Sequence, residues 1–264
     1  MIKDITIGQY FPGDTVVHKL DPRMKIIVTF IFIISLFFIN DFLPYLFIVT
    51  FMVTTILLSK IPIKYIFKGL KPIMIIILIT FVINLFVTDG KTLLEIGPVD
   101  ITEEGLYKAV FMALRLVFLI TGTSLLTLTT SPISLTDGIE HLLNPFKRIG
   151  VPAHELAMMM TIALRFIPTL LEETDKIMKA QMARGADFES GNILNRAKSL
   201  VPLLVPLFVS AFRRADELAM AMEARCYRGG ENRTRMKQLK LEKRDYISLG
   251  VALILLIGII IYRV

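Results

Sequence analysis

The stretch that decides the fold is IIVTFIFIISLFFINDFLPYLFIVTFMVTTILL, residues 26–58, in which Asp41 is the only charged residue. An apolar run of this length is typical of chain segments that cross a lipid bilayer. The polar pair Asn40-Asp41 divides the run into residues 26–39 and 42–58. We therefore expect two membrane-spanning helices joined by a very short turn.

Three further apolar runs continue this pattern along the chain. Residues 73–87, 106–128 and 247–262 carry two charged residues between them, both in the second of these runs. Several of the five runs are shorter than the roughly 20 residues that cross a bilayer core. Flanking polar side chains can complete such a span by reaching towards water. The sequence therefore predicts an all-α, polytopic membrane protein with about five spans.

The overall composition agrees with a membrane protein and excludes other classes. The 264 residues are 54% apolar, and their mean hydropathy is +0.65. This apolar content excludes a disordered chain, and the single cysteine, Cys226, excludes a disulfide-stabilised scaffold. The net charge of +7 is compatible with nucleic-acid binding or with the cytoplasmic side of a membrane protein.

The positions of the basic residues favour the membrane interpretation. Lysine and arginine gather in residues 1–25 and 59–72, whereas residues 88–105 are mainly acidic. Basic residues next to a span mark its cytoplasmic end. We therefore expect the N-terminus and residues 59–72 in the cytoplasm, with residues 88–105 and the C-terminus outside. Nucleic acid is not needed to explain the charge.

One long segment differs from the spans. Residues 131–245 are as charged as a soluble domain and contain few strand signals. They predict two long helices, over residues 152–184 and about 197–225. We therefore expect a transmembrane domain of four spans at 1–130, a cytoplasmic helical domain at 131–245, and a last span at 246–264 that packs with the first domain.

The two predicted long helices end alike. The chain reads AQMARG at residues 180–185 and AMEARC at residues 221–226, so the pattern Ala-x-x-Ala-Arg-small recurs after 41 residues. In one interpretation, each arginine complements the negative end of a helix dipole. In the other, the two ends bind equivalent sites on partner proteins, because small residues permit close approach and arginine donates to carboxylates or carbonyls. The pattern alone leaves both open.

Other candidate residues point to structural roles. Arg115 lies inside the fourth apolar run, and an ionisable residue there is a functional candidate by default. We expect it instead to bond backbone carbonyls, or Asn84. His18, His141 and His154 lack ligand spacing and there is no second cysteine, so we expect no metal site. The chain has no Gly-rich phosphate loop, so ATP would be hydrolysed elsewhere.

Three groups of residues, taken in order, resemble the motifs of a known family over essentially the whole chain. They are YFPGD … HKLDPRMK at residues 10–14 and 18–25, RFIP … ARG at 165–168 and 183–185, and RRADELA … EARCYRG at 213–219 and 223–229. These resemble the motifs of the transmembrane (T) component of energy-coupling factor transporters. Cys226 departs from the glycine that follows the arginine of the first coupling motif.

The resemblance implies a non-catalytic membrane scaffold with a cytoplasmic coupling domain of two long crossed helices. Each Arg-bearing helix end would dock on one of two ABC-type ATPase subunits, alike or different, which bind the ATP. An apolar helix surface would hold one S-component at a time, shared or dedicated, and that subunit would bind a vitamin or metal ion. Carried over by motif, the coupling residues are Arg184 and Arg225 with their close-packed neighbours Ala183, Gly185, Ala224 and Cys226.

The same resemblance suggests where the S-component would bind. Methionines cluster in the two long helices, either as ordinary packing or as an adaptable surface that accepts different partners. We expect this contact surface at Met158, Met159, Met160, Leu203 and Leu207.

Three alternatives to a shared vitamin-uptake scaffold in the cell membrane stay open. The first is a T-component dedicated to cobalt or nickel. The second is a self-sufficient secondary transporter, which predicts inverted repeats within the membrane, whereas the repeat found here lies in the charged segment. The third is an intramembrane enzyme, for which the spans contain no paired carboxylates or comparable constellation.

Overall fold

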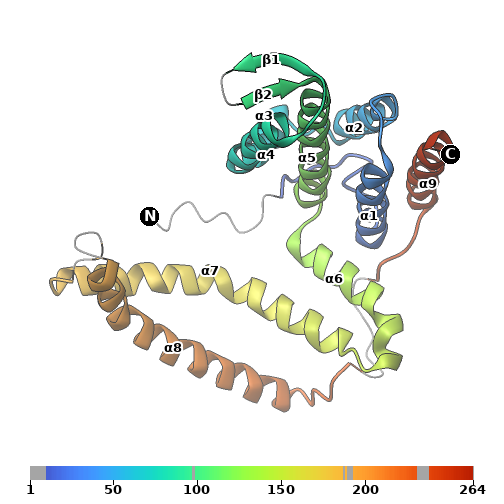
Figure 1. Cartoon of the computed structure of the whole chain (residues 1–264). Helices are drawn as coiled ribbons and strands as arrows, with labels where there is room; N and C mark the ends of the chain where they lie inside the picture. The colour runs from blue at the N-terminus through green and yellow to red at the C-terminus, as the bar shows by residue number, and fades with distance from the viewer. Residues whose placement is uncertain (1–9, 97–98, 187, 189–192, 231–237, 264) are drawn as a thin grey trace. The chain divides into compact units, whose positions relative to one another are not determined.

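The computed structural model describes residues 10–96, 99–186, 188, 193–230 and 238–263 (Figure 1). The chain divides into two compact units. We call Gly8–Gly138 with Gln238–Val264 the membrane unit, and Ile139–Lys237 the two-helix unit. The predicted helical class is confirmed, because helices make up nearly all regular structure in both units.

Five helices of the membrane unit correspond to the five apolar runs. They are α1 (Pro22–Phe38), α2 (Tyr45–Ser59), α4 (Met74–Val87), α5 (Glu103–Thr129) and α9 (Lys243–Arg263). The first begins four residues before its apolar run, because the Asp21 carboxylate accepts a hydrogen bond from the Arg23 N–H and Pro22 occupies the first helical position. A capping residue, rather than hydrophobicity, therefore sets where α1 starts.

The basic segment at residues 59–72, for which no helix was predicted, is partly helical. It contains α3 (Ile63–Leu70) and the 3₁₀ turn η2 (Lys71–Ile73), which leads into α4. Apolar residues recur in α3 with helical spacing, and Ile66 is buried. At Gly69 an added Cβ would lie 3.0 Å from the Ser124 Oγ of α5. This glycine therefore lets α3 lie close against α5.

A short β-hairpin separates α4 from α5. Strands β1 (Thr92–Ile96) and β2 (Val99–Thr102) pair antiparallel, with an irregularity between Thr92 and Leu94. No strand was predicted for residues 88–105. The sequence between the two strands contains the pair Gly97-Pro98, a turn signal that lies outside the described residues.

Helix α5 organises the membrane unit. It packs against α1, α3 and α4, and α1 in turn packs against α9 (Figure 1). The core contains Leu36, Ile48, Leu128 and Ile259, each at most 1% exposed. This brings the last helix of the chain next to the first.

Four described helical segments are long and apolar enough to cross a membrane. They are Ile63–Val87, Glu103–Thr129, Ala153–Ala183 and Lys243–Arg263. Helices α1 and α2, with 17 and 15 residues, are shorter. The structure thus agrees with a polytopic membrane protein, while the count of five spans stays a prediction.

The two-helix unit is named for α7 (Ala153–Ala183) and α8 (Ile193–Ala224), which form the two arms of a helical hairpin (Figure 1). Helix α6 (Pro132–Leu143) and the 3₁₀ turn η3 (Asn144–Ile149) precede them. Helix α6 follows α5 after only two residues, and the boundary between the two units falls within α6.

Candidate functional site

The end of α7 is closed by a Schellman motif. Arg184 is the capping residue, and Gly185 follows with a left-handed backbone at φ +90°. The N–H of Gly185 donates to the Met182 carbonyl at 2.9 Å. The N–H of Ala186 donates to the Gln181 carbonyl at 3.0 Å, which is the longer bond that defines this motif. Glycine suits the left-handed position because it has no Cβ.

Helix α8 ends in the same motif, 41 residues later. Arg225 follows the last helical turn, and Cys226 has a left-handed backbone at φ +54°. The N–H of Cys226 donates to the Glu223 carbonyl at 2.8 Å, and the N–H of Tyr227 donates to the Met222 carbonyl at 3.0 Å. Each donor and each acceptor is the repeat equivalent of one at the α7 end. The sequence repeat is therefore also a repeat of backbone geometry.

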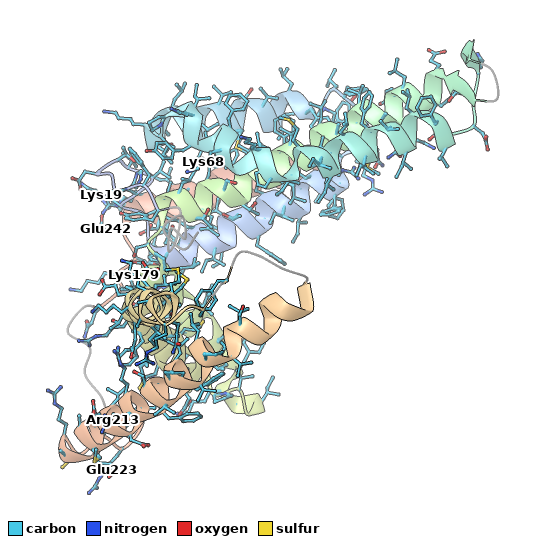
Figure 2. The ribbon with its side chains drawn as sticks, turned by 90° about the vertical axis from the view of Figure 1, so that its left-hand side faces the viewer. Lys19, Lys68, Lys179, Arg213, Glu223 and Glu242 are labelled. Carbon is cyan, nitrogen blue, oxygen red and sulfur yellow. The ribbon has the colours of Figure 1, made fainter. Side chains whose placement is uncertain are left out.

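The side chains of Arg184 and Arg225 are both exposed. Ala183 and Ala224, which precede them, are exposed as well, and the free Cys226 thiol is exposed. Figure 2 labels Glu223 at this end of α8. Because the neighbours are small, a partner surface can come close to each guanidinium, whose planar donors match carboxylates and carbonyls. The six residues carried over from the resemblance thus lie at two exposed, matching helix ends.

An ion pair joins the two long helices at matching positions. The Arg214 Nη2 lies 2.6 Å from the Glu173 Oε2, and these residues are again 41 apart. Closer to the α7 end, the Gln181 Nε2 donates to the Pro202 carbonyl at 3.4 Å. These contacts join α7 and α8 at two places along their length.

Helix α8 carries an exposed apolar stripe that was not predicted from the sequence. Its members share one helix face and are each more than half exposed: Val201, Val205, Phe208, Val209 and Phe212. Side chains at these spacings lie along one side of a helix. A contiguous apolar face in a charged unit indicates a surface for another protein or for lipid.

The residues expected to contact an S-component are distributed differently. Met159 is 57% exposed and Met160 is 36% exposed. Met158 is half-buried, and its sulfur accepts a hydrogen bond from the Tyr227 hydroxyl at 3.1 Å. Leu203 is only 6% exposed, and Leu207 is half-buried. The expected set is thus only partly on the surface, and its role stays a prediction.

The N-terminal motif fastens the first and last helices together. The Asp21 carboxylate accepts from both the N–H and the side chain of Arg23, with the Nη2–Oδ2 distance at 2.8 Å. The N–H of Asp21 itself donates to the Oδ1 of Asp245 in α9 at 2.8 Å. The other carboxylate oxygen of Asp245, Oδ2, accepts from the N–H of Glu242 at 2.7 Å. Asp245 is 1% exposed. This part of the motif is therefore a structural clasp.

Lys25 and His18 extend the clasp to α5. The Lys25 Nζ donates to the carbonyls of His18 at 3.0 Å and Thr129 at 2.8 Å. The His18 ring lies 2.7 Å from the Thr15 Oγ1 and 3.0 Å from the Phe11 carbonyl oxygen. Burial is the main cause that lowers the pKa of His18 from its usual 6.5, so the neutral ring is favoured.

Arg115 bonds a backbone carbonyl, one of the two kinds of partner expected from the sequence. Its Nη2 donates to the Ile39 carbonyl oxygen, at the end of α1, at 2.7 Å. The guanidinium also lies 4.9 Å from the centroid of the Phe111 ring and 5.8 Å from that of Phe37. Asn84 bonds within its own helix, to the Thr80 carbonyl. Arg115 thus caps α1.

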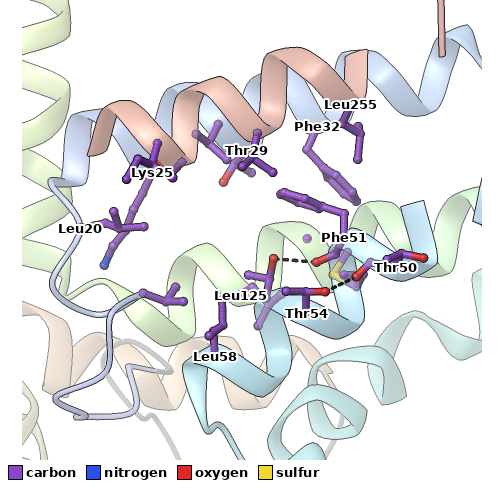
Figure 3. A pocket seen from close by; sticks show the side chains of 18 of the residues that line it. Leu20, Lys25, Thr29, Phe32, Thr50, Phe51, Thr54, Leu58, Leu125 and Leu255 are labelled. Carbon is purple, nitrogen blue, oxygen red and sulfur yellow. Dashed lines mark hydrogen bonds between the residues drawn. The ribbon is translucent and has the colours of Figure 1, made fainter. Parts of the chain in front are cut away.

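An apolar groove of about 840 Å³ lies between α1, α2, α5 and α9 of the membrane unit (Figure 3). Its wall includes Phe32, Phe51 and Leu255. The Thr50 and Thr54 hydroxyls that line it donate to carbonyls of their own helix. Substrate sites normally add a few converging polar groups to an apolar wall. These two hydroxyls are thus engaged within the protein, and the wall of the groove is mainly apolar.

Within the described residues, no group of three His, Cys, Asp or Glu side chains is placed to hold a metal ion.

These features define a class of protein: a polytopic helical membrane protein that carries two matching, arginine-bearing helix ends on a separate unit. The model of one family, described as cobalt transport protein (CbiQ), matches residues 13–236. The chain is 65% identical over 262 residues to the energy-coupling factor transporter transmembrane protein of Thermosediminibacter oceani, covering 99% of both chains.

Two further relatives carry the same name. The protein of Clostridium kluyveri is 65% identical over 266 residues, covering 100% of this chain and 98% of its own. The protein of Bacillus subtilis is 51% identical over 263 residues, covering 99% of both. The chain belongs to the family of energy-coupling factor transporter transmembrane proteins, as its motifs predict.

Proposed function

We propose that this chain is the scaffold that couples ATP hydrolysis by two partner ATPase subunits to movement of a substrate-binding S-component. The observation that carries the proposal is the pair of matching helix ends at Arg184 and Arg225. Two ends with the same cap and the same hydrogen bonds suit two similar docking grooves. Helix dipoles alone require neither this match nor the small neighbouring residues.

Several features support this division of labour. The chain has no phosphate-binding loop of its own, so the ATP would be bound by the partners. The groove of the membrane unit is lined mainly by apolar side chains, which favours a partner or lipid over a polar substrate. The exposed stripe on α8, from Val201 to Phe212, gives an S-component an apolar surface. On this proposal the two-helix unit lies in the cytoplasm, where ATP is available.

The names of similar proteins give only a general indication of the substrate class. The family description names cobalt transport, whereas the names of the relatives specify no substrate. We propose uptake of vitamins or other micronutrients through exchangeable S-components, with a dedicated cobalt or nickel system as the alternative. Mass spectrometry of the subunits that co-purify with the chain separates the two, because a dedicated system yields one S-component and a shared scaffold yields several.

The coupling proposal is tested by arginine replacement in the reconstituted complex. Arg184→Ala and Arg225→Ala should each weaken ATPase docking or lower substrate uptake per ATP hydrolysed. The double variant should be worse than either, because truncating a buried charged contact at an interface costs about 2–5 kcal/mol. The matched controls are Lys176→Ala on α7 and Arg148→Ala on η3, which remove exposed charges that belong neither to the quoted motifs nor to the two arginine ends.

The controls should keep normal uptake and normal ATPase binding. Wild-type uptake by the double arginine variant, at equal abundance in the membrane, would overturn the proposal. So would an equal loss in the two controls, because the effect would then be one of general charge.

A further inference from the structure

We propose that Tyr227, His154 and Glu140 position the Arg225 helix end by fastening it to α6, so that the two coupling ends are mechanically unequal. We call these three residues the tyrosine chain. The inference rests on the proposed coupling role for its consequence in transport. The contacts themselves lie within the two-helix unit and are testable without any partner.

The tyrosine chain starts inside the cap of α8. Tyr227 is the residue whose N–H closes the Schellman motif, on the Met222 carbonyl at 3.0 Å. Its hydroxyl lies 3.1 Å from the Met158 Sδ and 3.4 Å from the His154 Nε2, both on the first turns of α7. The backbone that holds Arg225 is thus tied, through one side chain, to the opposite end of the other arm.

The chain continues from α7 to α6. The His154 Nδ1 lies 2.9 Å from the Glu140 Oε1, and the two side chains are 30% and 12% exposed. When Nδ1 carries the proton and donates to Glu140, Nε2 is an acceptor that shares the single Tyr227 hydroxyl proton with the Met158 sulfur. The hydrogen bonds then run in one direction from Tyr227 to the carboxylate.

Backbone packing holds the histidine in place. An added Cβ at Gly230 would overlap the His154 ring, so the chain after α8 passes directly against it. Glu140 lies in α6, which is separated from α5 by only two residues. A displacement of the Arg225 end therefore has a bonded path to the helix that leads into the membrane unit.

The α7 end cannot make the same contact. The repeat equivalent of Tyr227 is Ala186, which closes its motif with the same backbone bond but has only a methyl side chain. The two ends therefore share the cap that presents the arginine and differ in the side chain that anchors it. We infer that motion of the ATPase bound at Arg225 is transmitted to α6, whereas motion of the ATPase bound at Arg184 is not transmitted by this route.

The anchoring is tested on the full chain alone, in detergent, by electron paramagnetic resonance. Cys226 is the only cysteine and is exposed, so a spin label reports the α8 end without any added mutation. Tyr227→Phe removes only the hydroxyl, and the label should become more mobile. Tyr246→Phe is the matched control, because this tyrosine of α9 is 58% exposed. Unchanged mobility in Tyr227→Phe would overturn the anchoring.

The consequence is tested in the unlabelled complex with its ATPases and one S-component. Tyr227→Phe and His154→Ala should lower transported substrate per ATP by about threefold to tenfold, the range expected from loss of one hydrogen bond, while ATPase binding stays normal. His154→Gln should restore part of the ratio, because glutamine can also donate and accept. A purely structural role would lower abundance or ATPase binding and leave the ratio unchanged.

The two proposals fail in different ways. If Arg225→Ala leaves transport unchanged, the coupling role fails whatever the label shows. If Arg225→Ala impairs transport and Tyr227→Phe frees the label without changing the ratio, the coupling role stands and the positioning role is overturned.

Discussion

Replacing Gly185 with alanine should loosen the helix end that presents Arg184 by about 1 kcal/mol. Gly185 has φ +90°, a conformation that L-residues adopt at a cost of roughly 1–2 kcal/mol. An added Cβ would meet nothing within 4 Å, so crowding adds no further cost. Alanine also restricts the unfolded chain, which offsets part of the loss.

Hydrogen exchange of single amides measures this loss directly. The reporter is the N–H of Ala186, which donates to the Gln181 carbonyl only while the motif is closed. A change of about 1 kcal/mol in local opening corresponds to about fivefold faster exchange, after correction for intrinsic rates. The N–H of Tyr227, at the other end, should keep its rate.

One reciprocal variant and one distant variant serve as controls for this measurement. Cys226→Gly relieves the left-handed strain at φ +54°, so exchange at Tyr227 should slow by a similar factor. Gly250→Ala lies inside α9, where nothing approaches within 4 Å, so exchange at both Ala186 and Tyr227 should keep its rate. If Gly185→Ala left exchange at Ala186 unchanged, the assignment of the cap would be refuted.

Three other outcomes follow from the membrane unit, each measurable by thermal unfolding in detergent. Gly122→Ala should destabilise by about 1–3 kcal/mol, because its Cβ would lie 2.5 Å from the buried Phe32 ring. Asp245→Asn should lower the free energy of unfolding by about 1–3 kcal/mol. The carboxylate accepts from the N–H groups of Asp21 and Glu242, whereas an amide has only one acceptor oxygen for the two. Because the pKa of His18 is lowered in the folded protein, the unfolded chain binds more protons as pH falls below about 6.5. The free energy of unfolding should therefore decrease in that range, and it should decrease less in His18→Gln.

Much of the fold could be predicted because the decisive signals are local. An uncharged apolar run specifies a membrane helix wherever the chain places it, and residues 26–58 contain two such runs in succession. The helix in residues 59–72 and the β-hairpin were missed. The four lysines of residues 59–72 obscured the helical period of Ile63, Ile66, Phe67 and Leu70, and the Gly97-Pro98 pair is equally typical of a plain loop.

The candidate site was predictable in part. The pattern Ala-x-x-Ala-Arg-small placed both arginines at helix ends, because helix termination is specified by a few neighbouring residues. The burial of Leu203 and the exposed stripe from Val201 to Phe212 were not predictable from hydrophobicity, because all are apolar. Which apolar side of α8 is covered depends on what packs against it.

The sequence by itself determined the membrane class, the positions of the long helices and the 41-residue repeat, since each depends on residues close together in the chain. Only the tertiary structure decided that Arg115 binds the Ile39 carbonyl, that Asp245 holds the N–H of Asp21, and that Tyr227 reaches His154. These partners are 76, 224 and 73 residues apart. No local pattern specifies such a pair, because the fold brings the two groups together and burial requires that their polar atoms be satisfied.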